Sequence, residues 1–183
     1  MLTLDQLKKI IPLAGARSAV FLGPLNDAMA EFGIDSASRQ SAFLAQVAHE
    51  SGSLVYVSEI ASGLAYNARV DLGNTKPEAV AIARQHNNKP GPWWKGHGLI
   101  QITGYDNHLA CGAALGLDLL HQPLLLEQPI NAARSAAWFW KEHGLNELAD
   151  VGAFRPITRV INGGFNGFAD RLAFYQRATE VLT

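Results

Sequence analysis

Apolar residues recur every three or four positions along most of this chain, a spacing that is typical of helices with one buried face. Each pattern is delimited by prolines, glycines or capping residues, which mark where helices begin and end. The helix that ends at Glu50 is expected to begin at Asp35 or Ser36, and Gly52 follows it as a stop signal. The other expected helices cover residues 4–11, 19–32, 77–85, 107–115, 130–140, 156–161 and 170–182.

Residues 61–92 depart from this periodicity and are rich in glycine, asparagine and proline, with only the short helix at Pro77 inside them. A long irregular segment in a compact domain is usually functional or mobile, and we interpret this one as the wall of a cleft. Residues 99–102 then favour a short strand that leads into a turn.

The chain is therefore predicted to be one domain, residues 1–183. It consists of a helical core, residues 1–60 and 105–183, and a cleft-wall lobe of about residues 61–104.

Two carboxylates near the end of the third helix are the first candidates for chemistry. Glu50 lies in the last helical turn, where the negative end of the helix dipole and an apolar neighbourhood would both disfavour the ionised carboxylate. Glu59 follows a glycine turn and the run Leu54–Val57, which can return along the cleft and bring it opposite Glu50. One protonated and one ionised carboxylate suit acid/base glycoside hydrolysis. The alternative is that both are solvated surface charges.

Composition limits the classes of function. The 183 residues are 48% hydrophobic and 17% charged, which argues against disorder, and the net charge of −1 gives no global attraction to nucleic acid or anionic lipid. The single Cys111 cannot form an internal disulfide and is expected to be a packing thiol. The N-terminus lacks the apolar run of a signal peptide or a membrane span.

Metal and cofactor chemistry find little support in the sequence. His49 and Glu50 begin like the HExxH zinc signature, but Gly52 and Ser53 stand where the second histidine would be needed. No two histidines are three or four residues apart, and the glycines at 96–104 lack the lysine of a phosphate-binding loop. We expect no metal and no cofactor.

The segment from Pro92 to His108 supplies candidates for ligand contact. Trp93 and Trp94 can either clamp a core under a loop or stack on the apolar faces of sugar rings. Gln101 and Thr103 would share one side of the expected strand and could bind one ligand. In the helix at 130–140, Trp138 and Trp140 are expected in the core.

Four motifs in order resemble glycoside hydrolase family 19, and most closely its small phage and prophage endolysins, which are relatives of plant-type chitinases. They are HES at 49–51, GHGLIQITGYDNH at 96–108, AAWFW at 136–140 and ITRVINGGFNGFADR at 157–171. The resemblance spans roughly residue 36 to the C-terminus. It implies a lysozyme-like, mainly α-helical fold with a cleft between two lobes.

The resemblance also implies roles for individual residues. Glu50 would be the general acid, Glu59 the base that activates water, and Thr103 a residue that helps to hold this water. The family inverts the anomeric configuration, which requires carboxyl groups about 6.5–9.5 Å apart. Arg171 would support the catalytic carboxylates, unless it is a surface pair. The expected substrate-binding residues are Gln101, Tyr66, Trp94, Asn107 and Asn162, with the alternative that Asn162 caps its helix in a left-handed conformation.

The expected substrate is a β-1,4-linked amino-sugar polymer, with the glycan strands of peptidoglycan favoured over chitin. His97 and Tyr105 stand where many relatives carry arginine, which bears on how sugar substituents are gripped. The alternatives are a chitinase, a non-catalytic cell-wall-binding module, and a zinc amidase or peptidase. We expect a monomer that is made in a host cytoplasm and acts on the cell wall after release, without binding nucleic acid or a membrane.

Overall fold

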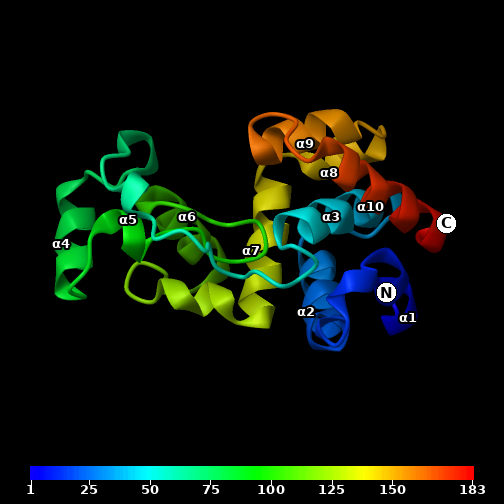
Figure 1. The fold of residues 1–183 in the computed structure, drawn as a ribbon, viewed down its shortest axis with the longest axis horizontal. Coiled ribbons are helices and arrows are strands. Elements are labelled where there is room, and N and C mark those ends of the chain that lie inside the picture. The colour runs from blue at the N-terminus through cyan, green and yellow to red at the C-terminus, as the bar shows by residue number, and fades with distance from the viewer.

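The computed structural model describes all residues, 1–183, and is almost entirely helical (Figure 1). Its α-helices are α1 (Leu4–Ile10), α2 (Arg17–Glu31), α3 (Ala37–Glu50), α4 (Pro77–Gln85), α5 (Pro90–Trp93), α6 (Tyr105–Leu115), α7 (Pro129–Glu142), α8 (Leu145–Asp150), α9 (Phe154–Asn162) and α10 (Phe168–Leu182). Short 3-10 turns lie at η1 (Pro12–Ala14), η2 (Leu64–Tyr66), η3 (Val70–Leu72) and η4 (Pro123–Glu127). None of the helices has the length and apolar character needed to cross a membrane.

The caps explain several of the helix boundaries. Thr3 begins α1 with a capping box, in which its hydroxyl accepts from the backbone of Gln6 and the Gln6 side chain accepts from the backbone of Thr3. Ser36, one of the two expected caps, begins α3 by accepting from the backbone N–H of Arg39. The positions predicted for these helices are therefore confirmed to within about two residues.

The molecule has two lobes with separate buried cores, joined by α7 (Figure 1). The larger lobe contains α1–α3 and α7–α10 around one core of 30 buried residues. The smaller lobe, residues 61–128, has two small apolar clusters. Trp140, with none of its surface exposed, packs edge-on against Phe43, and Trp138 is 9% exposed, so both tryptophans are in the core as expected.

The smaller lobe continues past the predicted boundary at about residue 104. The larger core contains no residue between 101 and 131. Cys111 and Leu115 of α6 pack instead with Leu119, Leu126 and Trp138, because these residues fill the gap between α6 and α7. Burial raises the pKa of the Cys111 thiol to about 12, which fits its expected role as a packing residue.

The strand predicted at residues 99–102 is wrong. Gln101 has a φ of +58°, and the segment forms a tight turn that is closed by reciprocal backbone hydrogen bonds between His97 and Ile102, of 3.1 and 2.8 Å. The structure contains isolated β-bridges at Ser58–His97 and His97–Ile102, but no named strand. Gly98 permits the turn because its φ is +84° and an added Cβ would lie 2.6 Å from the hydroxyl of Ser135.

Candidate active site

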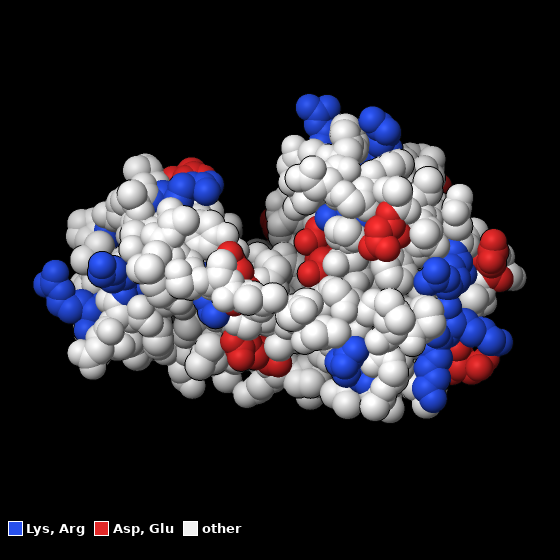
Figure 2. Space-filling view, viewed as in Figure 1, with Lys and Arg blue, Asp and Glu red and all other residues white.

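A deep notch separates the two lobes, with acidic side chains on both of its sides (Figure 2). Glu50 and Glu59 are each fixed to a different lobe. Glu50 is the last residue of α3 in the larger lobe, and Glu59 is hydrogen-bonded to residues of the smaller lobe. The two carboxylates therefore belong to different lobes, with the notch between the lobes.

Glu50 is held by a buried arginine. Its Oε1 lies 2.5 Å from a terminal nitrogen of Arg171, whose side chain is 1% exposed, while the side chain of Glu50 is 20% exposed. The apolar neighbourhood predicted for Glu50 is therefore incomplete, because a cation is in direct contact with the carboxylate. The alternative that Arg171 is a surface pair is wrong.

Two further groups contact the guanidinium of Arg171, and a third group orients one of these two. One terminal nitrogen donates to Oε1 of Gln46 at 2.5 Å, and Nε donates to the backbone oxygen of Asn166 at 3.2 Å. The Gln46 amide in turn donates to the hydroxyl of Thr158 at 2.9 Å. Gln46 and Thr158 have no exposed surface, so the orientation of Arg171 toward Glu50 is set inside the core. Sequence reasoning missed Gln46, although it lies one helical turn before Glu50 on the same face of α3.

Glu59 is oriented by two hydrogen-bond donors. Tyr66 donates its hydroxyl to Oε1 at 2.8 Å, and the backbone N–H of Gly96 donates to Oε2 at 3.1 Å. The hydrogen bond to Glu59, together with burial, raises the pKa of Tyr66. The backbone around Glu59 is also paired, since its N–H donates to the oxygen of Gly96 and Gly98 donates to Val57, both at 2.8 Å.

Gln101, Thr103 and Asn107 all line one pocket of about 310 Å³. Its other lining residues come from α7 and α9 of the larger lobe and from the turn itself: Trp138, Phe139, His143, Val160, Ile161, Ile100 and Ile102. The Thr103 hydroxyl donates to the backbone oxygen of Gln101 at 3.0 Å, and the Asn107 amide donates to the oxygen of Thr103 at 2.7 Å. The pocket thus bridges the lobes and is lined by residues of both.

Asn162 is the last residue of α9 and is half-buried. Its Oδ1 accepts from the backbone N–H of Asn166 at 3.1 Å and so stabilises the turn into α10. The left-handed residue at this end is Gly163, with a φ of 73°, so the alternative that Asn162 caps α9 in a left-handed conformation is wrong. Neither Asn162 nor Glu50 or Glu59 lines the pocket that contains Gln101.

The prediction that Trp94 contacts substrate is wrong. Trp94 has no exposed surface and packs edge-on against Tyr105, with a centroid separation of 5.0 Å. Its neighbour Trp93 is the accessible tryptophan. The two differ because the single turn of α5 directs adjacent side chains to different sides. Trp93 stacks on His86 at 4.2 Å and donates its indole N–H to the oxygen of Leu120.

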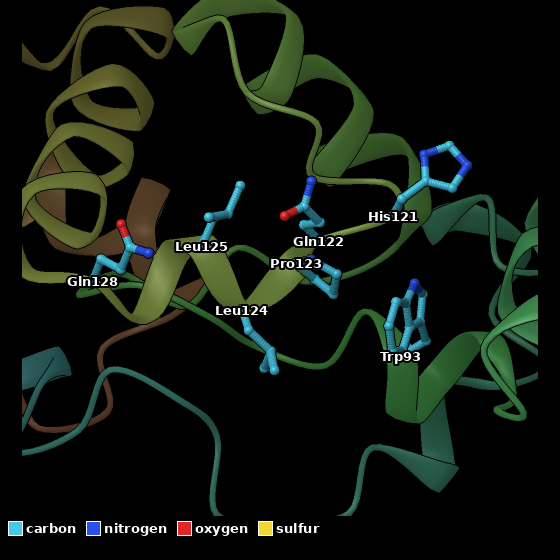
Figure 3. Close-up of a pocket in the computed structure, with 7 residues that line it drawn as sticks. All are labelled: Trp93, His121, Gln122, Pro123, Leu124, Leu125 and Gln128. Carbon is cyan, nitrogen blue, oxygen red and sulfur yellow. The ribbon is translucent and has the colours of Figure 1, made fainter.

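Trp93 lines a second pocket, of about 290 Å³, in the smaller lobe (Figure 3). Figure 3 shows side chains from η4 and the preceding loop around it, and the complete lining is Trp93, His121, Gln122, Pro123, Leu124, Leu125 and Gln128. Trp93 was a candidate for stacking on sugar rings, but none of the catalytic or substrate-binding residues that the family resemblance implies lines this pocket. No group of three or more histidine, cysteine or acidic side chains in the structure could hold a metal ion.

A two-lobed helical body with carboxylates on both sides of its cleft is the arrangement expected of a lysozyme-like glycosidase. The chain belongs to glycoside hydrolase family 19, because the family model described as chitinase class I matches residues 26–147. A glycosyl hydrolase family 19 domain-containing protein of Haemophilus influenzae is 34% identical over 158 residues, which cover 75% of this chain and 77% of that protein.

Other relatives are plant endochitinases. Endochitinase 2 of Gossypium hirsutum is 30% identical over 184 residues, covering 81% of this chain and 59% of its own length. An endochitinase of Arabidopsis thaliana is 36% identical over 125 residues, covering 68% of this chain but 39% of its own length. The chain therefore spans about two fifths to three fifths of these plant relatives.

Among solved structures, chitinase C of Streptomyces griseus HUT6037 superposes with a TM-score of 0.75 at 25% identity, over 98% of this chain and 76% of that one. A class IV chitinase of Zea mays gives a TM-score of 0.64 at 25% identity, over 90% of this chain and 80% of that one. The expected lysozyme-like helical fold and the expected glycoside hydrolase class are confirmed.

Proposed function

We propose that this glycoside hydrolase cleaves β-1,4 linkages between the amino sugars of peptidoglycan, with Glu50 as general acid and Glu59 as general base. The observation that carries the proposal is the attachment of the two carboxylates to opposite lobes, each with its own set of fixed partners. A sugar linkage in the notch would then have one carboxyl group on each side, as inverting hydrolysis requires.

The proton donor is Glu50. Its carboxyl O–H donates to the glycosidic oxygen while the bond from that oxygen to C1 breaks, so the leaving sugar departs as a neutral alcohol. Arg171 then stabilises the carboxylate that remains, since its guanidinium already lies 2.5 Å from Oε1. The reaction is thereby assisted at the leaving group.

The base is Glu59. It takes one proton from a water molecule as the water oxygen bonds to C1 on the face opposite the leaving group, which inverts that carbon. Tyr66 and Gly96 hold the carboxylate in place during this transfer. The hydroxyl of Thr103 donates to Gln101 and keeps its lone pairs free to accept from the same water. Solvent then returns a proton to Glu50 and removes one from Glu59.

Gln101, Asn107 and Asn162 are proposed to bind the sugars on either side of the cleaved linkage. Gln101 and Asn107 supply amide groups in the pocket that bridges the lobes, and Asn162 ends α9 beside the pocket-lining residues Val160 and Ile161. Amides suit this task because they both donate and accept, as sugar hydroxyl and acetamido groups do.

Mass spectrometry of fragments released from purified sacculi tests this function. We expect soluble muropeptides with new reducing ends and no new amino groups, and activity that persists in a chelator. Release of stem peptides, with the glycan left intact, would contradict the proposal and favour an amidase. Pull-down on sacculi without any release of reducing ends would favour a binding module.

A chitinase is the second candidate, because the curated plant relatives are named endochitinases and the superposed structures are titled chitinases. A neutral hexamer of β-1,4-linked N-acetylglucosamine, assayed at the same enzyme concentration, separates the two. A kcat/KM for the hexamer that exceeds the value for sacculi-derived strands of equal length would favour chitin as the substrate.

The role of Glu59 has its own test. Glu59→Ala is expected to lose nearly all turnover of the hexamer, and added azide is expected to restore it, because azide attacks C1 without needing a base. The product should be a glycosyl azide of inverted configuration. Turnover by Glu59→Ala at the wild-type rate without azide would exclude Glu59 as the base.

A further inference from the structure

Two arginines on α9 have no carboxylate or hydrogen-bond partner within the protein. Arg155 and Arg159 are both exposed, and neither forms an ion pair or a hydrogen bond. By contrast, Arg39, Arg134 and Arg171 all contact carboxylates at 2.5–2.7 Å. The two guanidinium groups of α9 are therefore available to an external ligand.

Their placement on α9 brings these two charges close together. Positions 155 and 159 are four residues apart and lie on one face of the helix, so their side chains are neighbours. Two like charges at this spacing repel each other, and no carboxylate of the protein offsets the repulsion. An anionic group that binds between them would relieve it.

Arg155 is also held in position. Its guanidinium carbon lies 4.1 Å from the ring centroid of Phe165 and 5.4 Å from that of Phe168. Stacking on an aromatic face limits the motion of the side chain and leaves its N–H groups at the ring periphery, free to donate. Phe165 is 39% exposed and directly precedes Asn166, whose backbone oxygen accepts from Arg171, the partner of Glu50.

The same helix borders the cleft. Val160 and Ile161 line the pocket that contains Gln101 and Thr103. Basic side chains stand at the top of the larger lobe beside the notch, in the region where Figure 1 places α9 (Figure 2). On the helical repeat, Arg155 and Arg159 share the face of α9 that carries Asn162, a residue proposed above to bind a sugar, and point away from Val160 and Ile161.

We propose that Arg155 and Arg159 form a carboxylate-binding rim for the peptide stems that project from the glycan strand, an inference that rests on the proposed function. Arginine matches carboxylates with paired, charge-assisted hydrogen bonds. The free carboxylates of peptidoglycan stems provide such ligands, whereas chitin is neutral and provides none. With a net charge of −1 the protein has no global attraction to an anionic polymer, so this local pair supplies it.

The test compares R155Q/R159Q with wild type and with R84Q. Arg84 of α4 is a matched control, since it is exposed and free of ion pairs but lies on the far side of the smaller lobe. At low salt, the double variant is expected to lose about fivefold to tenfold in kcat/KM on sacculi, in keeping with two exposed charge contacts. Its rate should also depend less on salt. R84Q should stay within twofold of wild type.

Two other substrates show whether the lost contact is to carboxylates. The neutral N-acetylglucosamine hexamer should be cleaved equally by all three proteins. On sacculi whose carboxylates have been converted to amides, the double variant and wild type should have the same kcat/KM. Equal loss on the hexamer, or an undiminished difference on amidated sacculi, would overturn the proposal.

A measurement of binding to sacculi tests the arginine proposal separately from the proposed hydrolase function. Sedimentation with sacculi is measured for Glu50→Gln alone and for Glu50→Gln with R155Q/R159Q, so that no cleavage is needed. Weaker, less salt-dependent binding of the triple variant supports the rim even if wild type releases no fragments from sacculi. Unchanged binding would overturn the proposal that Arg155 and Arg159 bind stem carboxylates. The proposed hydrolase function is tested separately, by the activity of wild type on sacculi.

Discussion

A buried histidine pair makes the wall that carries Glu59 sensitive to acid. Nδ1 of His108 donates to the backbone oxygen of Gly104 at 2.8 Å, which leaves Nε2 of His108 to accept from Nδ1 of His97 at 3.3 Å. Both rings are neutral in this arrangement and nearly unexposed. His97 also lies between the backbone that pairs with Glu59 and the turn that ends at Ile102.

The size of the effect follows from the pKa values. Burial and the neighbouring His108 lower the pKa of His97 to about 3, and burial lowers the pKa of His108 to about 4. The unfolded chain binds protons at both rings below about pH 6.5, while the folded chain does not, so the free energy of unfolding falls as the pH falls from 6.5 toward 4.

Within this window each ring lowers the free energy of unfolding by about 1.4 kcal/mol for every pH unit of acidification. At pH 5 the loss is about 2 kcal/mol per ring. The pair therefore removes about 4 kcal/mol at pH 5, a large share of a typical stability of about 5–15 kcal/mol. Carboxylates with lowered pKa values, such as Glu31 beside Arg134, lose their contribution mainly below pH 4.5 and so add little here.

Urea denaturation at several pH values between 6 and 4.5 measures this dependence. We expect a slope of about 2.7 kcal/mol per pH unit for wild type and about half of that for His108→Gln. The exposed His143 serves as the control, and His143→Gln should keep the wild-type slope. A slope that His108→Gln leaves unchanged would refute the reasoning, whatever the variant does to stability at pH 7.

Three further substitutions test individual contacts. Tyr66→Phe removes the hydroxyl that orients Glu59 and should lower kcat on the hexamer by about tenfold or more with little change in KM, because hydrogen bonds to charged groups are worth about 1.5–3 kcal/mol; an unchanged kcat would show that Gly96 alone holds the carboxylate. Arg171→Met leaves Glu50 and Gln46 without their buried partner and should lower the free energy of unfolding by about 3–5 kcal/mol in urea, whereas a loss below about 1 kcal/mol would mean that the ion pair contributes little. Trp94→Ala should cost about 3–5 kcal/mol of stability but leave hexamer affinity in the folded protein within twofold, as measured by calorimetry, and a tenfold weaker affinity would restore Trp94 as a binding residue.

The helices could be predicted from sequence because their signals are local. The capping residues Thr3 and Ser36 and the spacing of buried side chains in α3 and α7 depend on neighbours within one or two turns. The turn at residues 97–102 could not be predicted from sequence, because its apolar residues also suit a strand. Only the pairing of Gly98 with Val57 and its packing against Ser135 distinguish a turn from a strand here.

The site was predictable to the extent that motifs carry it. Glu50 and Glu59 are candidates from their positions in the sequence, while their individual roles and the role of Arg171 come from the family resemblance. Their partners Gln46 and Tyr66 lie 4 and 7 residues away along the chain from the carboxylates that they help to hold. Trp94 was misassigned because adjacent tryptophans are equivalent in a sequence pattern. Their burial is decided by α4 and α6, which enclose Trp94 with Ala79, Ala83 and Tyr105 and leave Trp93 at the surface.

Hydrolysis of the neutral hexamer by Glu50→Gln tests most directly whether Glu50 is the proton donor. The substitution keeps the shape of the side chain but removes the acidic proton, so we expect a loss of about 10²–10⁴-fold in kcat in protein that unfolds cooperatively in urea. Such a loss, with hexamer binding retained, is the result that our account predicts. A folded Glu50→Gln protein that cleaves the hexamer within about threefold of the wild-type rate would contradict it.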